Sequence, residues 1–400
     1  MALPYEMIDE ILCRLPVKPL LRFQCVSKEW CGLTDSNAFA KKQLRNTLDC
    51  NANAGLGLMI VVKRKGDRRF YLAGSDSLDD DESAAVAEID GPLKSVLYNA
   101  HIVGSSNGLM CVFKNVMDVF VLNPTTRKYR KIARVPPEFR SGPIMKKLCG
   151  FGYDEVDDDF KVVMFTEPHF FRGLISVYSL KTNTWAEVQD VPDDFSFTCL
   201  NKSRALFLNG SLYWMAQKAL DHQCNSKVII VGFDLKLRHF REVPLPPIEG
   251  AHPGFSNSNL VDIGGCLCFL DILDSHMDLW LMNYPGANSI WHKAFSVKKQ
   301  EMPTHTSFSK LVAFSGNRED ILLQVRGFHT QLAWYNIDRK TVKNIGIQGI
   351  PLQYCSFLYT ESLLQLTEDE ALQQTIKRQE KEECIKMERV QNSTREMRDK

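Results

Sequence analysis

The sequence predicts a multidomain α + all-β protein: three or four short helices, then a six-bladed β-propeller, then a charged C-terminal helix. Two observations carry this prediction. Apolar residues at helical spacing end near residue 48, whereas residues 55 to 360 consist of short apolar runs between Gly, Asn, Asp and Pro turns, which indicates strands. Within that second region one turn pattern recurs at a near-constant interval. We therefore divide the chain into residues 1–48, 55–366 and 367–400.

The helical segment begins at Pro4, a residue tolerated in a first turn, and Pro16 ends its first helix. A short second helix follows, Val26 to Trp30 form the third, and Ser36 can cap a fourth over residues 37–48. So few helices are too small a unit for a core of their own. The segment is therefore predicted to share its apolar surface with a partner protein or, as the alternative, to form a cap on the rest of this chain.

The stretch LPYEMIDEILCRLPVKPLLRFQCVSKEWCGL resembles an F-box, in which L-P, E-I-L-x-R-L-P, L-x-R-F and V-S-K-x-W recur in this order. The resemblance implies binding to a Skp-type adaptor and, through it, to cullin and RING subunits. It departs from the usual pattern at Thr34 and Asn37. The residues that match the family's interface or core pattern, with the choice between the two left open, are Leu3, Pro4, Ile8, Ile11, Leu12, Leu15, Pro16, Leu20 and Trp30.

The repeat in the second region is a strand, a polar turn and an aromatic or β-branched residue that opens the next strand. The residues that close the turns are Tyr129, Trp185, Phe240, Trp291 and Val342, which step by 56, 55, 51 and 51. A hairpin signal precedes each one. Four strands in about fifty residues are typical of kelch-like propeller blades. Five blades are evident, and a sixth is assembled from strands near residues 56–90 completed by the late strand YCSFLYTESL. The alternative is a pair of β-sandwiches.

The same region resembles the F-box-associated interaction domain that follows the F-box in many plant proteins. The motifs that carry this resemblance are GSSNGLMCV, LNPTTRKYRKI, GFGYDEVDDDFKVV, VYSLKTNTWAEV, NGSLYWM, GGCLCFL and YTESL, in that order. The family consists of receptors that hold a target protein. The resemblance therefore implies that this chain is the substrate-recognition subunit of an SCF-type (Skp–cullin–F-box) ubiquitin ligase, which promotes ubiquitination and degradation of an unidentified protein.

Composition narrows the alternatives. A formal net charge of +1 argues against nucleic acid or a membrane as the main partner. Twelve cysteines without a C-x-x-C indicate reduced thiols and a cytoplasmic or nuclear protein, and we expect neither a signal peptide nor a membrane span. Zinc-binding RING spacing and a nucleophilic cysteine context are both missing from the sequence. We therefore expect no catalytic residue, no metal and no cofactor. The alternatives are a propeller enzyme or lectin with a helical cap, and a ligase-independent scaffold.

Loop lengths predict which face of the propeller binds the target. Turns within the first and last hairpins of each blade are short, whereas the middle turns and the links between blades are long and varied, and long loops on a rigid frame usually carry binding residues. Aromatic and arginine side chains in the long loops are favoured at interfaces; some of them could instead pin their own loops. The candidates are Phe139, Arg140, Phe170, Phe171, Arg172, Phe195, Phe255 and Phe308. The Glu/Lys/Arg-rich residues 367–400 are expected to form a charged tail that is either a solvated helix or disordered.

Overall fold

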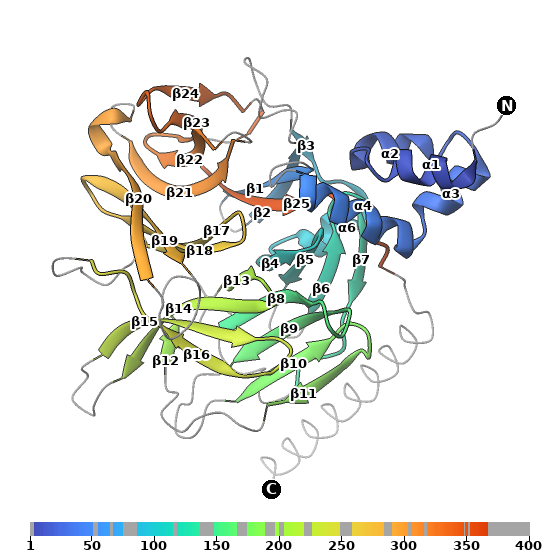
Figure 1. Ribbon diagram of the computed structural model, residues 1–400, viewed down its shortest axis with the longest axis horizontal. Coiled ribbons are helices and arrows are strands. Elements are labelled where there is room, and N and C mark those ends of the chain that lie inside the picture. Colours follow the sequence, from blue (N-terminus) through green and yellow to red (C-terminus); the bar gives the residue numbers. More distant parts are fainter. Residues whose placement is uncertain are drawn as a thin grey trace, which may run out of the picture.

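The computed structural model describes residues 4–50, 55–64, 67–74, 86–114, 118–136, 148–165, 174–188, 197–199, 204–219, 226–248, 258–283, 290–302, 306–315, 318–347, 349–350 and 353–366. A helical module and a ring of six β-sheets make up this part of the chain (Figure 1). The predicted C-terminal helix over 367–400 lies outside the described residues. No described helix is long and apolar enough to cross a membrane.

The helical module contains α1 (Tyr5–Leu12), α2 (Val17–Phe23), α3 (Lys28–Thr34) and α4 (Asn37–Cys50). Pro16 precedes α2, as its effect on the backbone predicts. Ser27 caps α3 by accepting a hydrogen bond from the Trp30 N–H at 3.1 Å, and Ser36 accepts one from the Phe39 N–H at 3.2 Å. The third helix was predicted to begin at Val26, which is wrong: the cap at Ser27 places its first residue at Lys28.

Six antiparallel sheets form the blades, and we number them in chain order with the innermost strand first. Blade 1 contains β25 (Tyr354–Thr360), β1 (Leu56–Arg64), β2 (Asp67–Gly74) and β3 (Ala87–Glu88). Blade 2 contains β4 (His101–Ser106), β5 (Leu109–Phe113), β6 (Val119–Asn123) and β7 (Lys128–Lys131). Blade 3 contains β8 (Leu148–Asp154), β9 (Asp159–Phe165), β10 (Ile175–Ser179) and β11 (Thr184–Glu187).

The second half of the ring repeats this order. Blade 4 has β12 (Phe197–Cys199) and β13 (Leu206–Leu208) both paired with β14 (Ser211–Ala219), followed by β15 (Ser226–Asp234) and β16 (Phe240–Val243). Blade 5 contains β17 (Asn259–Ile263), β18 (Cys266–Ile272), β19 (His276–Asn283) and β20 (Ile290–Lys298). Blade 6 contains β21 (Ser307–Phe314), β22 (Asp320–Arg326), β23 (Thr330–Asn336) and β24 (Val342–Ile345). Outside the blades are the short helix α6 (Gly91–Leu97) and a 3-10 turn, η3 (Lys299–Glu301).

The last strand of the chain closes the ring. β25 pairs antiparallel with β1, so that Thr360 lies opposite Leu56 and Tyr354 opposite Val62. Blade 1 is thus assembled from both ends of the propeller, and its edge is paired rather than left open. The predicted six blades and the predicted closure by the YCSFLYTESL strand are confirmed.

A recurring turn explains the period seen in the sequence. Asn123, Asp234 and Asn336 each end the third strand of a blade, and the side-chain oxygen of each accepts a backbone N–H from the turn that follows. A residue near the end of each of these turns has a positive φ, for example +59° at Arg127 and +55° at Lys340. In blades 2, 4 and 6 the turn thus starts with an Asn or Asp and reaches a left-handed conformation before the next strand.

The antiparallel pairing gives the ring two distinct faces. The inner strands β25, β4, β8, β13, β17 and β21 run side by side around the channel, and the face at which they end is here named the turn face. It carries short turns such as 107–108, 155–158 and 264–265. The opposite face is the loop face, at which β7 and β9 end and β8 and β10 begin. The blades pack on one another through apolar clusters that lie between neighbouring sheets.

Candidate functional site

Residues 361–366, which follow β25, form a buried segment on the turn face that we name the strap. Asn123 holds it: the side-chain amide donates to the Ser362 carbonyl at 3.0 Å, the Ser362 hydroxyl at 3.1 Å and the Leu364 carbonyl at 3.0 Å. Gly108 also faces it, with a φ of +80° and room for no side chain, because a Cβ there would lie 2.1 Å from the Ser362 Oγ. The motifs LNPTT, SSNGL and YTESL thus meet in space and fix the strap.

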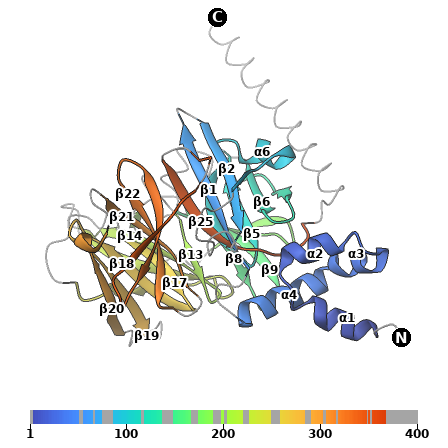
Figure 2. The ribbon, with the colours of Figure 1, turned by 90° about the horizontal axis from the view of Figure 1, so that it is seen from above.

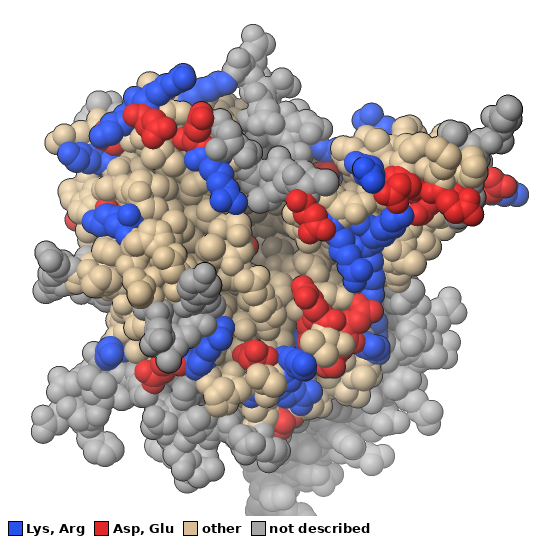
Figure 3. Space-filling model, in the orientation of Figure 1, with Lys and Arg blue, Asp and Glu red and all other residues tan. Residues whose placement is uncertain are grey.

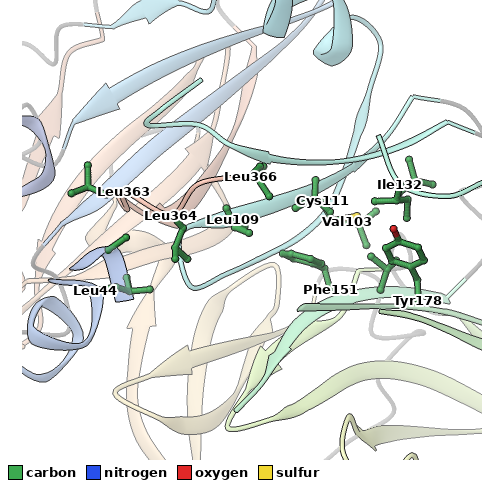
Figure 4. Close-up of a cluster of buried hydrophobic side chains, with 14 of the residues drawn as sticks. Leu44, Val103, Leu109, Cys111, Ile132, Phe151, Tyr178, Leu363, Leu364 and Leu366 are labelled. Atoms are coloured by element: carbon green, nitrogen blue, oxygen red, sulfur yellow. The ribbon is translucent and has the colours of Figure 1, made fainter. Parts of the chain in front are cut away.

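The helical module packs on the strap and on blades 2 and 3. Leu44 of α4 shares one buried cluster with Leu363 and Leu364 of the strap and with Leu109 and Phe151 of the blades (Figure 4). Burying a leucine side chain contributes about 1.5–3 kcal/mol, so this cluster is a substantial joint. One of the two readings of the sequence, a helical unit packed on the rest of the chain, therefore describes this side of the module.

Polar contacts fix the orientation of the module at the same joint. The Gln365 N–H donates to the Asn37 side chain at 3.1 Å, and the Gln365 amide donates to Asp35 at 3.3 Å. Lys41 pairs with Asp158 of the turn between β8 and β9 at 2.6 Å. Because residues 155–158 and the strap both lie at the ends of inner strands, the module sits on the turn face, to one side of the ring (Figure 2). Asn37, where the sequence departs from the F-box pattern, is thus used to bind the strap.

The structure separates the nine residues predicted to serve the adaptor interface or the module core. Leu12 and Leu20 are buried against the propeller, with exposed fractions of 2% and 0%. Ile8, Leu15 and Trp30 are partly buried against the same cluster. These five residues support the module and its joint.

The remaining predicted residues face outward or cannot be placed. Pro4, Ile11 and Pro16 are exposed, whereas Leu3 lies outside the described residues. Two exposed apolar residues were missed: Met7 of α1, 51% exposed, and Val26, 62% exposed. Met7 and Ile11 are four residues apart on α1 and so share a helix face. Large apolar side chains left in water on one side of a small module are typical of a protein-binding surface.

Charged side chains lock α1 to α4. Lys42 pairs with Asp9 at 2.6 Å and with Glu10 at 2.8 Å, and Arg14 also pairs with Glu10. Hydrogen bonds from Lys42 and Arg14 lower the pKa of Glu10 to about 2. Acidic and basic side chains lie next to one another on this module and around the rim of the ring (Figure 3). The face in that view carries no extended region of a single sign.

Only one of the eight candidate target-binding residues, Phe308, lies within the described part of the chain. Phe139, Arg140, Phe170, Phe171, Arg172, Phe195 and Phe255 lie outside the described residues. Phe308 belongs to strand β21 rather than to a loop, and its half-buried side chain packs against the cluster between blades 5 and 6. Phe308 therefore anchors its own strand, which is the second reading that the sequence left open for such residues.

The channel brings together basic residues that are far apart in the sequence. Arg204, just before β13, reaches the Phe357 ring of β25 with its guanidinium carbon 4.3 Å from the ring centre. Lys310 of β21 approaches the same ring, its Nζ 4.8 Å from the centre. Arg68 of β2 donates to the Ala100 carbonyl at 3.1 Å. No sequence motif marks these residues, because only closure of the ring makes them neighbours.

A four-helix module seated on a six-bladed propeller, with apolar residues still exposed on its outer side, defines an F-box protein of the propeller type. The comparisons agree: an F-box domain matches residues 1–42, and an F-box associated beta propeller domain matches residues 57–368. The chain therefore belongs to the plant F-box proteins that carry an F-box-associated propeller domain. We refer to its helical module as the F-box from here on.

Its relatives share this organisation along most of their length. The chain is 28% identical to F-box protein CPR1 of Arabidopsis thaliana, over 90% of this chain and 88% of that protein. It is 29% identical to the F-box/kelch-repeat protein At3g23880 of the same plant, over 84% and 87%. Among solved structures, TolB from Acinetobacter baumannii matches 80% of this chain and 72% of its own at 11% identity, with a TM-score of 0.44. A likeness of that size supports no functional conclusion.

Proposed function

We propose that this protein is the substrate-recognition subunit of a Skp–cullin–F-box ubiquitin ligase, with the Skp-type adaptor bound to the F-box and the target bound to the loop face. The observation that carries the proposal is the division of the F-box surface. Leu12 and Leu20 are buried in the joint with the propeller. Met7, Ile11 and Val26 are exposed to solvent. An F-box that served only as a cap would have no need of that second apolar surface.

A receptor of this kind acts by position rather than by chemistry. The F-box is fixed to the turn face by an apolar cluster and by the pair between Lys41 and Asp158. A target on the opposite, loop face would be held at a defined distance from the adaptor, and holding two reactants in place accelerates transfer between them. The covalent steps belong to the other ligase subunits. We infer that the protein itself is not an enzyme and that it works in the cytoplasm or nucleus.

The test is capture of the adaptor by the purified chain. Replacing both Met7 and Ile11 by Ser removes two apolar side chains that are half exposed. Burying the exposed half of such a side chain against the adaptor would contribute about 1 kcal/mol of binding free energy for each residue. The expected effect is a loss of affinity of roughly 10–100-fold, without a change in melting temperature, because neither side chain is buried in the free protein.

Leu48 supplies the matched control. It is 45% exposed on α4 of the same module, so Leu48→Ser removes a comparable exposed side chain outside α1. Adaptor binding that survives the double substitution, or that suffers equally from Leu48→Ser, would contradict the proposed interface. A target that accumulates when residues 1–44 are deleted distinguishes a ligase subunit from a scaffold without ligase function.

A further inference from the structure

Basic side chains surround one end of the propeller channel without acidic partners. Within the described part of the chain, no carboxylate forms an ion pair with Arg204, Lys310 or Arg68. Two of them donate to backbone carbonyls instead: Lys310 to Ser356 at 3.1 Å and Arg68 to Ala100 at 3.1 Å. Uncompensated charges at close range are costly, and proteins retain them chiefly where they bind something.

The aromatic ring between the cations offsets only part of this cost. A cation over an aromatic face gains about 0.5–2 kcal/mol, but here Arg204 and Lys310 share the single ring of Phe357. Burial, with Arg204 close by, lowers the pKa of Lys310 to about 8. Water nevertheless reaches the site, because the Arg204 side chain is exposed.

Strand positions locate this group at the loop face. Arg68 stands near the start of β2 and His101 at the start of β4, which are the ends of those strands at the loop face. Arg204 forms a parallel bridge with Cys149, the second residue of β8. The F-box occupies the turn face, so the basic group opens away from it, among the segments expected to bind the target.

We propose that the loop-face mouth of the channel, where Arg204 and Lys310 meet the ring of Phe357 and Arg68 lies nearby, is an anion-binding site that receives a carboxylate or phosphate group of the bound target. Planar guanidinium groups and lysine ammonium groups are suited to both anions. That the anionic group belongs to a target protein rests on the proposed function, whereas the binding of an anion at this site does not. The site would select targets that present an acidic or phosphorylated side chain at the ring centre.

The thiol of Cys355 can report the electrostatic potential at this site. It is exposed on β25, and its charge interacts with those of Arg68, Arg204 and Lys310. Iodoacetate and iodoacetamide alkylate the same thiolate, but only iodoacetate is an anion. The ratio of the iodoacetate rate to the iodoacetamide rate is therefore independent of how exposed the cysteine is and of its thiolate fraction, and it reports the local electrostatic potential. At low salt this ratio at Cys355 should exceed that at the exposed Cys25 of the F-box by about threefold or more.

Added anions and one substitution complete the test. Inorganic phosphate or acetate at constant ionic strength should lower the ratio at Cys355 but not at Cys25, and an effect of phosphate alone assigns the site to phosphorylated targets. Lys310→Met keeps the length of the side chain without the charge. It should raise the melting temperature in the absence of phosphate and abolish the stabilisation by phosphate that the parent chain shows.

A merely structural role for the cations predicts the reverse: Lys310→Met would lower the melting temperature through the lost contact with Phe357. That result, or equal alkylation ratios at Cys355 and Cys25, overturns the anion site. Neither experiment contains adaptor or target, so their failure leaves the proposed ligase role standing, and failed adaptor capture leaves the anion site standing.

Discussion

Replacing Asn123 by Asp should release the strap while preserving the turn that Asn123 begins. The side-chain oxygen accepts the Thr125 N–H at 2.9 Å, and a carboxylate oxygen can take its place. The amide nitrogen, in contrast, donates to the carbonyls of Ser362 and Leu364. In the variant an oxygen would face those two carbonyl oxygens, and the residue is fully buried.

The magnitude follows from the partners that lose their donor. Each buried carbonyl left without a hydrogen bond costs about 1–3 kcal/mol, and the strap has two of them on Asn123. The repulsion between a buried carboxylate and these oxygens adds to that cost. We expect the free energy of unfolding to fall by about 4 kcal/mol and the melting temperature by roughly 5–15 °C.

Calorimetry of the full chain measures the loss, and hydrogen exchange of peptides covering residues 361–366 shows whether it lies in the strap. Asp234→Asn is the matched control, because Asp234 begins the equivalent turn of blade 4 and accepts the Lys236 and Leu237 N–H groups. That exchange should change stability by no more than about 0.5 kcal/mol. Equal effects of the two substitutions, or unchanged exchange at the strap, would refute the assigned role of Asn123.

Three further outcomes are expected. A chain ending at Thr360 keeps β25 but lacks the strap, and should melt well below one ending at Leu366; equal melting would refute the joint. Lys161→Met should lower the free energy of unfolding by about 3–5 kcal/mol, because it leaves the buried Asp154 carboxylate without its ion-pair partner. Adding Asp154→Asn should restore most of that stability, and a double variant as unstable as Lys161→Met would refute the pairing. Burial, with Arg68, Arg204 and Lys63 nearby, lowers the pKa of His101 to about 4. Because the unfolded chain binds the proton near pH 6.5 and the folded protein does not, the free energy of unfolding should fall between pH 6.5 and 4, and less so in His101→Gln. Identical pH profiles of the two proteins would refute this.

The fold was predictable because its signals are local and repeated. Blades 2, 4 and 6 each have a turn that starts with an Asn or Asp and contains a residue at positive φ, so the pattern returned at a similar position in each blade, as at Asn123 and Asn336. The helix boundaries of the F-box were equally local, since Pro16 precedes α2 and the Ser36 hydroxyl caps α4 within a few residues.

The division of roles within the F-box was not predictable. Ile11 and Leu12 are neighbours of similar chemistry on one short helix, yet one is half exposed and the other buried. The difference depends on where the strap passes, and the strap comes from the far end of the chain. The same holds for Arg204 and Lys310, which ring closure alone brings to one aromatic side chain.

The strap also sets the order in which the protein can mature. The F-box is synthesised before the propeller, whereas three leucines of the cluster on its inner side belong to residues 361–366. At roughly 5–20 residues per second, synthesis of the intervening chain of about 300 residues takes roughly 15–60 s. Throughout that interval the cluster that buries Leu12 and Leu20 lacks its three strap leucines, Leu363, Leu364 and Leu366. A message that is cut short before the codons of the strap would therefore yield an F-box that is not seated on the propeller, which makes synthesis through Leu366 a condition for a working receptor.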